Sequence, residues 1–258
     1  MGYTGREILG AYNIVWEPLP PGVGLALEEL ILHRLNEHLR RFLLVWRSTS
    51  SIVIGRRLSL CEEVNCSNAC IHNIPICRRL SGGGAVYHDP GNLNISLLAY
   101  TGHRYPVDKV YEYGLGIIRR LLSILGYDSH IENQNDIVIG KYKVSGSSAL
   151  ILKDRYLFHA TLLIEADTSL LDQVIVPRLD RVARGEVTPA KYNPWNLSSI
   201  GPMIRLHNVL HVLKQEIVKD MVNHRELVMM LLPYAYSRAL DYCMEPCGRA
   251  STESPVNV

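Results

Sequence analysis

Two hairpin patterns follow each other in the middle of this sequence, and they limit the possible folds more than any other feature. Short apolar, β-branched runs at residues 136–139 and 142–145 flank a Gly-Lys turn. Two further runs, at residues 147–153 and 156–165, flank an Asp-Arg turn in the same way. Consecutive hairpins pair as antiparallel strands, so this region does not fit the repeated βαβ units of a doubly wound sheet.

The rest of the chain alternates between helical and strand patterns. Helical periodicity marks residues 25–39, 107–125 and 206–217, and shorter helical stretches are predicted within 60–73 and 167–174. Short apolar runs predict strands at residues 42–47, 51–55, 75–80, 85–88 and 93–100. Because strands outnumber helices, we predict an α+β fold, with a mostly antiparallel or mixed β-sheet flanked by α-helices.

The composition is typical of an intracellular globular protein. The chain has 258 residues and 47% of them are hydrophobic, which is enough for one large domain with a sizeable core. Lys and Arg number 27 against 25 Asp and Glu, so we expect no nucleic-acid or anionic-membrane partner. No apolar run approaches the ~18 residues of a membrane helix, and no secretory signal pattern is found. We therefore expect a cytoplasmic protein.

Six cysteines are present, four of them between residues 61 and 77 and two at positions 243 and 247. No CxxC pair occurs, which argues against a zinc site. Two states stay open at this point. The thiols are reduced or buried, as in most cytosolic proteins, or they form disulfides, as in intracellular proteins of hyperthermophiles.

The most unusual stretch is Arg78 to Asn92, which contains RRLSGGGAVYHDPGN. Three consecutive glycines are entropically costly between strands unless the backbone must approach a ligand closely. Their N–H groups can converge on an anion, and the preceding arginines suit a carboxylate or a phosphate. Because His, Asp and Asn follow in the same window, we interpret the stretch as a binding site rather than a flexible turn. It matches neither GxGxxG nor GxxxxGK[ST].

Two further segments carry candidate chemistry. Lys143 lies on the return strand of the first predicted hairpin, where Val144 must face the other side of the sheet. An inward-facing lysine requires an anionic partner, whereas Lys141 at the turn is expected to point to water. Asp136 suits either a turn position or a Mg²⁺ ligand in a phosphate site. His159 interrupts an apolar strand, where a buried structural histidine is the simpler interpretation.

Together these segments resemble the lipoate–protein ligase A family of the biotin/lipoate ligase superfamily. The resemblance implies a biotin/lipoate ligase-like catalytic domain, similar to class II synthetases. It spans roughly Ile8 to Met221 in unbroken order. The matching motifs are Trp46-Arg47 with Ile52 to Gly55, the glycine stretch from Arg78 to Asn92, Asn135-Asp136 with Lys143 to Ser147, His159 to Leu163, and Asn196-Leu197.

The resemblance implies an enzyme that uses ATP and Mg²⁺ to convert lipoate into lipoyl-AMP, and then transfers the lipoyl group to a lysine of a carrier domain. Lys143 is expected to contact the lipoyl carboxyl group and the α-phosphate, and His159 is expected to close the acyl end. Residues expected to shape the lipoyl-AMP pocket are Arg79, Gly82, Gly83, Gly84 and His88. Residues expected on the nucleotide and metal side are Asn92, Asn135, Ser145, Gly146 and Asp136, the last as the Mg²⁺ ligand.

The sequence departs from the family pattern in places. Ala160 stands where the family has Gly, which leaves both lipoate and octanoate open as substrates, and Leu150 stands where an Arg is common. We expect residues 1–221 to form the catalytic domain and residues 222–258 a C-terminal helix and tail, too short for a second core. The resemblance therefore implies the large subunit of a two-component ligase, with a separate small accessory protein. The implied carrier is a 2-oxoacid dehydrogenase E2 lipoyl domain or a glycine cleavage H protein.

Two other functions stay open. One is an ATP-independent octanoyl or lipoyl transferase of the same fold. One transferase branch uses a nucleophilic cysteine, and no cysteine lies between Asp128 and Asp136, just before the lysine motif. The other is an inactive lipoyl-nucleotide binding protein, and the presence of Lys143 and the glycine run favours an active enzyme over it.

Overall fold

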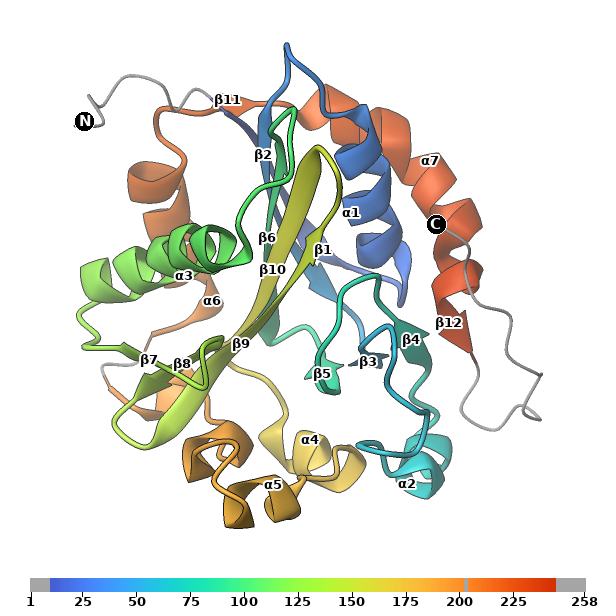
Figure 1. The fold of residues 1–258 in the computed structure, drawn as a ribbon, viewed down its shortest axis with the longest axis vertical. Helices are drawn as coiled ribbons and strands as arrows, with labels where there is room; N and C mark the ends of the chain where they lie inside the picture. Colours follow the sequence, from blue (N-terminus) through green and yellow to red (C-terminus); the bar gives the residue numbers. More distant parts are fainter. Residues whose placement is uncertain (1–9, 202–203, 245–258) are drawn as a thin grey trace.

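A large mixed sheet forms the centre of the molecule in a computed structural model that describes residues 10–201 and 204–244 (Figure 1). Its eight described strands have the order β11-β1-β2-β6-β10-β9-β8-β7. β1 pairs in parallel with β2 and β11, and the other pairs are antiparallel, which confirms the predicted fold class. The strands are β1 (Ala11–Leu19), β2 (Arg41–Ser48), β6 (Asn92–Tyr100), β7 (His130–Glu132), β8 (Asp136–Ile139), β9 (Tyr142–Ile151), β10 (Arg155–Leu163) and β11 (Val222–Asn223).

A smaller sheet stands beside the lower end of the large one in Figure 1. Among the described residues its order is β12-β4-β3-β5, formed by β3 (Ser51–Ile54), β4 (Ile76–Arg78), β5 (Val86–His88) and β12 (Cys243–Met244). Ile52, Ile54 and Ile76 pack there with Leu163 and Val174 in a separate apolar cluster. The connection from β4 to β5, residues 79–85, is called the glycine loop below.

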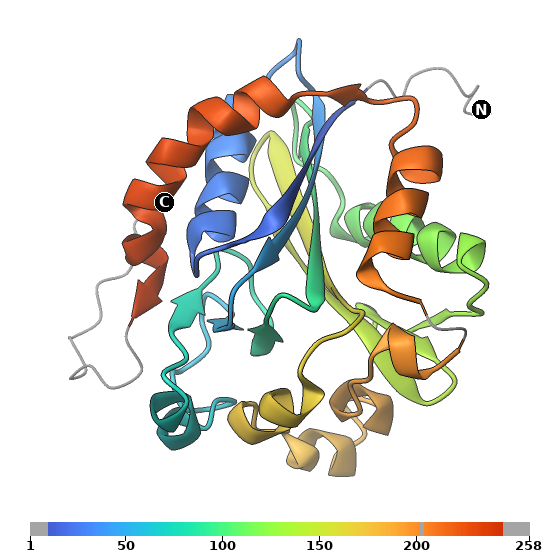
Figure 2. The same ribbon diagram turned by 180° about the vertical axis from the view of Figure 1, so that it is seen from behind.

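Helices cover both faces of the large sheet (Figures 1 and 2). On one face lie α3 (Val107–Ile124), α6 (Leu206–Val212) and the π-helical turn η3 (Leu213–Ile217). On the other face α1 (Val23–Arg34) and α7 (Arg225–Tyr242) pack side by side. The shorter helices near the small sheet and the lower edge are α2 (Cys66–Ile71), α4 (Thr168–Val174), α5 (Leu179–Ala183), η1 (Pro189–Tyr192) and η2 (Leu197–Ser199).

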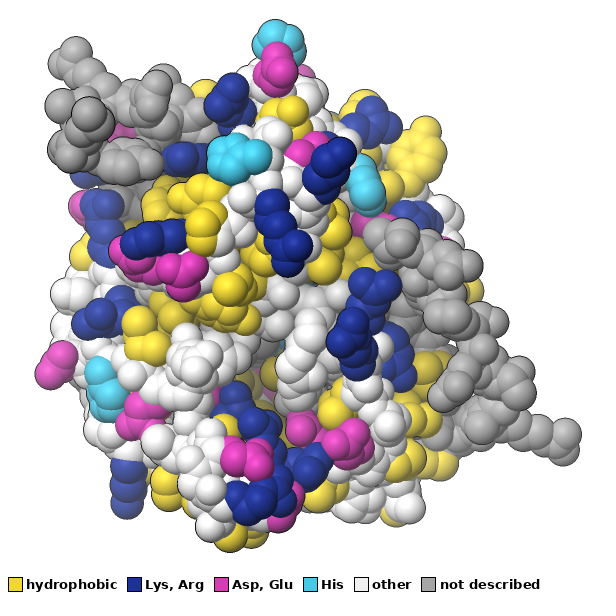
Figure 3. All heavy atoms as spheres, viewed as in Figure 1, with side chains coloured by type: hydrophobic (Ala, Val, Ile, Leu, Met, Phe, Trp, Pro, Cys, Tyr) yellow, Lys and Arg dark blue, Asp and Glu magenta, His cyan; other side chains and the backbone are white. Residues whose placement is uncertain are grey.

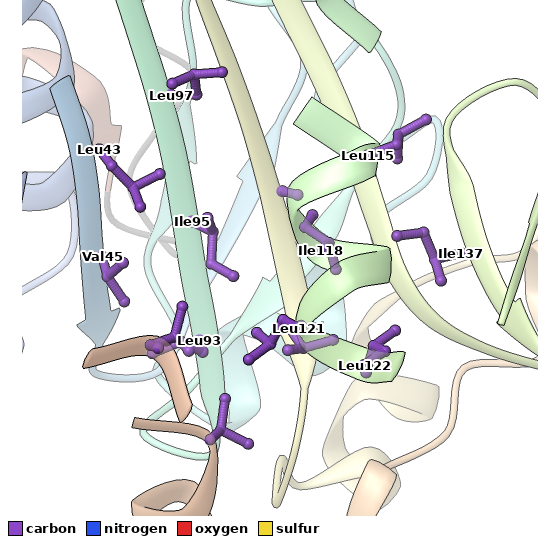
Figure 4. Packing of buried hydrophobic residues seen from close by; sticks show 14 of the residues in the cluster. Leu43, Val45, Leu93, Ile95, Leu97, Leu115, Ile118, Leu121, Leu122 and Ile137 are labelled. Atoms are coloured by element: carbon purple, nitrogen blue, oxygen red, sulfur yellow. The ribbon is translucent and has the colours of Figure 1, made fainter. Parts of the chain in front are cut away.

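Successive side chains of the central strands point to opposite faces of the large sheet, so the core is divided between these two faces. On β2, Leu43 and Val45 join the cluster under α3, whereas Phe42, Leu44 and Trp46 join the cluster under α1. Figure 4 shows part of the first cluster, with labelled side chains that come from β2, β6 and α3. Because both faces are covered, the strand carries a continuous apolar run instead of the alternation of a half-exposed strand.

The structure corrects several predicted boundaries. The first helix ends at Arg34 and not at residue 39, because Asn36 accepts hydrogen bonds from the N–H groups of His38 and Leu39 and closes a turn. β9 is one continuous strand shared by both predicted hairpins. β1 was not predicted, since Pro18 and the following prolines mark its end as a loop. The predicted tail after Glu245 lies outside the described residues.

Disulfides resolve the question that the sequence left open. Cys61 is bonded to Cys66, and Cys77 is bonded to Cys243 over a separation of 166 residues. No cysteine in the described part of the chain is free. The second bond joins β4 to β12 at the end of α7, so the last described helix is covalently attached to the strand that leads into the glycine loop. None of the described helices has an apolar stretch long enough to cross a membrane.

Substitutions at two glycines of α3 can test how this helix packs on the sheet. A Cβ atom at Gly114 would lie 2.4 Å from the Phe158 ring, whereas one at Gly116 would meet nothing within 4 Å. We expect Gly116→Ala to raise the free energy of unfolding by about 1 kcal/mol, because alanine favours the helix. Gly114→Ala should lower it by about 1–3 kcal/mol through overpacking. Urea unfolding under non-reducing conditions measures both, and equal changes would contradict the packing described.

Candidate active site

A cavity of about 510 Å³ lies between the glycine loop, strands β5, β9 and β10, and residues 175–195, which we call the covering segment. Its α1 side is lined by Leu25, Glu28 and Trp46, and its β8–β9 side by charged groups. Figure 3 shows side chains of both charge signs gathered over α5, within the covering segment. At that surface Arg178 and Arg184 both pair with Asp180.

Arg79 organises the glycine loop from inside. Its side chain is buried, and its Nη1 and Nη2 groups donate hydrogen bonds to the carbonyls of Val53, Gly82 and Gly84 at 3.1, 2.6 and 2.9 Å. Its Nε group donates to the Ser81 hydroxyl at 3.1 Å. Burial lowers the pKa of Arg79 to about 10, partly offset by nearby carboxylates, so the group stays charged at neutral pH.

Two glycines of the loop occupy positions where a side chain does not fit. Gly83 has φ +92°, and a Cβ atom there would lie 2.9 Å from Nη2 of Arg79. A Cβ atom at Gly84 would lie 2.2 Å from the Glu63 carboxylate, which accepts a hydrogen bond from the Ala85 N–H at 2.8 Å. The glycines therefore allow a close approach of the loop backbone to the side chains of Arg79 and Glu63.

His88 lines the cavity wall, and its imidazole ring is neutral. Burial, together with the charges of Arg79 and His159, lowers the pKa of His88 to about 3. Its ring meets the Trp46 ring edge-on at a centroid distance of 5.7 Å. Its Nδ1 atom is buried without a hydrogen-bond partner among the described residues.

Lys143 faces the cavity, and Val144 is buried on the other side of the sheet. The sequence required an anionic partner for an inward Lys143 without identifying it, and the structure gives Asp136, whose fully buried carboxylate lies 2.9 Å from Nζ of Lys143. A second lysine, Lys191 of η1, lies 3.1 Å from the same carboxylate. Burial and the charge of Lys143 lower the pKa of Lys191. Lys141 is exposed at the hairpin turn, as predicted.

The neighbouring polar residues fix the local course of β9. Asn135 donates to the Ser147 carbonyl at 2.6 Å, and the Ser147 hydroxyl donates to the Asn135 carbonyl at 2.8 Å. A Cβ atom at Gly146 would lie 3.1 Å from both Cε and Nζ of Lys143, so glycine there gives the lysine side chain its room. The Ser145 hydroxyl is buried without a partner among the described residues, at the cavity wall.

His159 belongs to a buried polar chain and is not an isolated core histidine. Its Nδ1 atom lies 2.9 Å from the Glu28 carboxylate of α1, and its Nε2 atom lies 2.6 Å from the Ser81 hydroxyl. The other Glu28 oxygen accepts a 2.5 Å hydrogen bond from Ser96, which in turn accepts one from the Trp46 indole at 3.1 Å. This chain links the glycine loop to the α1 side of the cavity.

The described residues do not fit a resident metal ion. They contain no group of three His, Cys, Asp or Glu side chains that could hold one. Asp136, predicted as the Mg²⁺ ligand, binds Lys143 and Lys191 and also accepts a hydrogen bond from Asn133 at 3.1 Å. A carboxylate already paired with two ammonium groups is a weak ligand for a divalent cation.

Most predicted site residues meet at this one cavity. Gly82 and Asn92 do not line it: the Gly82 carbonyl binds Arg79, and Asn92 is fully buried beside Asn94. Sequence reasoning missed Glu28 and Lys191, which no motif marks. Those that line the cavity are Arg79, Gly83, Gly84, His88, Asn135, Asp136, Lys143, Ser145, Gly146 and His159.

Comparisons with known proteins agree with this geometry. A relative from Aeropyrum pernix, which carries a provisional lipoate-protein ligase A name, is 36% identical over 239 residues, covering 92% of this chain and 90% of the relative. Lipoate–protein ligase 1 from Staphylococcus aureus is 32% identical over 82% of this chain, and the match spans 58% of that protein.

Solved structures show the same fold. A lipoate-protein ligase A bound with ATP has a TM-score of 0.72 at 22% identity, covering 89% of this chain and 96% of that one. A structure from Thermoplasma acidophilum, described as a bipartite lipoate protein ligase and its E2 lipoyl domain, has a TM-score of 0.69 at 23% identity, covering 89% and 94%. The family model "Lipoyl protein ligase A/B catalytic domain" matches residues 20–218. This chain therefore belongs to the lipoyl protein ligase A/B catalytic domain family.

Proposed function

We propose that this chain is an ATP-dependent lipoate–protein ligase. The observation that carries the proposal is the position of Lys143, an ammonium group held by the buried Asp136 carboxylate in the cavity that the glycine loop also lines. Activation of a carboxylic acid by ATP brings two anions together, so the site must supply fixed positive charge. Relatives with lipoate ligase names and a neighbour that binds ATP support this chemistry.

The first step is adenylation. A carboxylate oxygen of lipoate attacks the α-phosphorus of ATP, the bond from that phosphorus to the β-bridging oxygen breaks, and pyrophosphate leaves with the bonding electrons. Lys143 is suited to offset the charge shared by the carboxylate and the α-phosphate. The neutral His88 ring adds a polar atom to the wall without adding charge. A cavity of about 510 Å³ is large enough for a ligand of this kind.

The second step transfers the acyl group. The ε-amine of a carrier lysine attacks the acyl carbonyl carbon, the bond to AMP breaks, and the amine loses a proton as the amide forms. The acyl-adenylate is a mixed anhydride, and it must be kept from water until the carrier arrives. We propose a lipoyl domain of a 2-oxoacid dehydrogenase E2 or a glycine cleavage H protein as the carrier. We propose that Mg²⁺ enters as the counter-ion of ATP.

An ATP-independent transferase with a cysteine nucleophile has no support in this site. No cysteine of the described residues lines the cavity, and none of them is a free thiol. ATP–pyrophosphate exchange tests the proposed function directly. Exchange that depends on lipoate, measured beside octanoate and biotin, identifies the acid that is activated. A transferase and an inactive binding protein would both give no exchange with any of the three.

Lys143→Ala should lower lipoate-dependent exchange by about 10²–10³, the usual loss when one preorganised charge contact is removed. The fold should remain intact, because Lys191 still pairs with the buried Asp136 carboxylate. Lys141→Ala is the matched control, since this lysine lies on the same hairpin but is exposed at its turn. Equal losses in the two variants would contradict the role given to Lys143.

Gly83→Val should weaken the binding of lipoate more than the binding of ATP. The residue has φ +92°, and a side chain there meets the Arg79 guanidinium that orders the loop. Calorimetric titration with each ligand separately measures the two affinities. Gly116→Ala on α3 is the control, because its methyl group meets nothing within 4 Å. Unchanged lipoate affinity in Gly83→Val would mean that the loop is only a turn.

We further propose that residues 1–221 form the catalytic domain, that residues 222–258 add a helix and tail to it, and that a separate small protein completes the cycle. The described part of the second range, β11, α7 and β12, packs on the same two sheets. The bipartite ligase whose structure resembles this chain supports a second component.

With ATP, Mg²⁺ and lipoate, the chain alone should bind its ligands but lipoylate a carrier slowly. Addition of an accessory protein should raise the rate, because the acyl-adenylate is then better shielded from water and better positioned. A carrier-lipoylation assay with and without that protein measures the effect. Many rapid turnovers by the chain alone would contradict a two-component enzyme.

A further inference from the structure

Lys191 is a second lysine in the cavity, and nothing in the reaction outlined above uses it. Its Nζ atom lies 3.2 and 3.1 Å from the two oxygens of Asp136, and Nζ of Lys143 lies 2.9 Å from one of them. The carboxylate is fully buried, whereas the two lysine side chains are 17% and 20% exposed at the cavity. Two ammonium groups on one carboxylate leave an excess of one positive charge.

Hydrogen bonds hold Lys191 in register with Lys143. The N–H of Lys143 donates to the Asn193 carbonyl at 2.9 Å, and the Trp195 N–H donates to the Lys143 carbonyl at 2.9 Å. On the other side of Lys191, the Thr188 N–H donates to the Asn133 side chain at 2.8 Å. The covering segment is therefore attached on both sides of Lys191, to the turn before β8 on one side and to β9 on the other, and these bonds position the second ammonium group beside the first.

The surroundings of Lys143 and Lys191 indicate which anion would bind to their excess positive charge. The cations lie on the β8–β9 side of the cavity, whereas Trp46 and Leu25 line the α1 side. A carboxylate carries a single charge, which Lys143 alone can offset. A triphosphate carries several negative charges, and it needs more than one cation beside it.

We propose that Lys191 is a phosphate-binding catalytic residue, which exchanges Asp136 for the β- and γ-phosphates of ATP while Lys143 serves the α-phosphate. This inference rests on the proposed function. In the adenylation step Lys191 stabilises the charge that the leaving pyrophosphate acquires when the bond to the α-phosphorus breaks, and no proton is transferred. The covering segment thus supplies both a wall of the site and part of its charge.

The test compares three variants by calorimetric titration with ATP and with AMP, both in the absence of lipoate. Lys191→Ala should weaken ATP binding by about 10- to 100-fold, the range of a lost charged contact. Its AMP affinity should stay within about twofold of the unchanged chain, because AMP lacks the β- and γ-phosphates. Lys191→Arg should recover most of the ATP affinity. Melting temperatures establish that each variant is folded.

Asn133→Gly is the matched control for a merely structural role. Asn133 contacts the same carboxylate and the same segment as Lys191, but without charge, and glycine accepts its φ of +50°. This variant should bind ATP within about threefold of the unchanged chain. Equal losses for Lys191→Ala and Asn133→Gly, equal losses for ATP and AMP, or no loss in Lys191→Ala would each overturn the proposal.

A different experiment tests the proposed function, so its failure can be distinguished from a failure of the role given to Lys191. If the unchanged chain shows no lipoate-dependent ATP–pyrophosphate exchange, the ligase activity is wrong whatever the titrations show. If exchange is present and the Lys191→Ala titrations match the unchanged chain, only the role of Lys191 is wrong. In the expected case, Lys191→Ala also raises the KM for ATP in the exchange assay more than the KM for lipoate.

Discussion

The guanidinium group of Arg79 holds the part of the chain on which the cavity depends. It is buried, and it donates to the backbone carbonyls of Val53, Gly82 and Gly84. Charged hydrogen bonds of this kind contribute about 1.5–3 kcal/mol each, and a buried cation that loses its partners costs more. The carbonyls of the loop therefore accept the hydrogen bonds that the buried guanidinium group needs, and these bonds in turn order the loop. Gly83 and Gly84 line the cavity in a defined conformation because hydrogen bonds from this one side chain order the loop.

A second buried polar chain couples that wall to the hydrophobic core. It passes from Ser81 through His159 to Glu28 of α1, and then through Ser96 to Trp46 of β2. Each member is buried or nearly so, and each needs its neighbour, because a buried polar group without a partner is costly. The position of α1 on the sheet and the position of the glycine loop therefore depend on each other. The same packing that stabilises the fold also sets the width of the cavity.

Local pattern was enough to predict the hairpins, the glycine loop and the orientation of Lys143, because strand alternation places Val144 on the opposite face. Long-range partners were not predictable. Lys191 reaches Asp136 from the short helix η1, 55 residues further along the chain. Glu28 lies in an apolar helix beside another glutamate, and no spacing distinguishes it. β1 and the disulfide between β4 and β12 likewise depend on pairings that only the folded chain brings together.

Asp136 explains how one side of the cavity can hold two cations before any ligand arrives. Two ammonium groups that lie close together repel each other, because the effective dielectric constant near a protein surface is well below that of water. The carboxylate between Lys143 and Lys191 offsets this repulsion and keeps both lysines directed into the same space. The cost of assembling the charges is then met during folding, so an incoming polyanion finds them already in place. The buried carboxylate of Asp136 thus helps to form a binding site for anions, because without it the two lysine side chains would turn towards water.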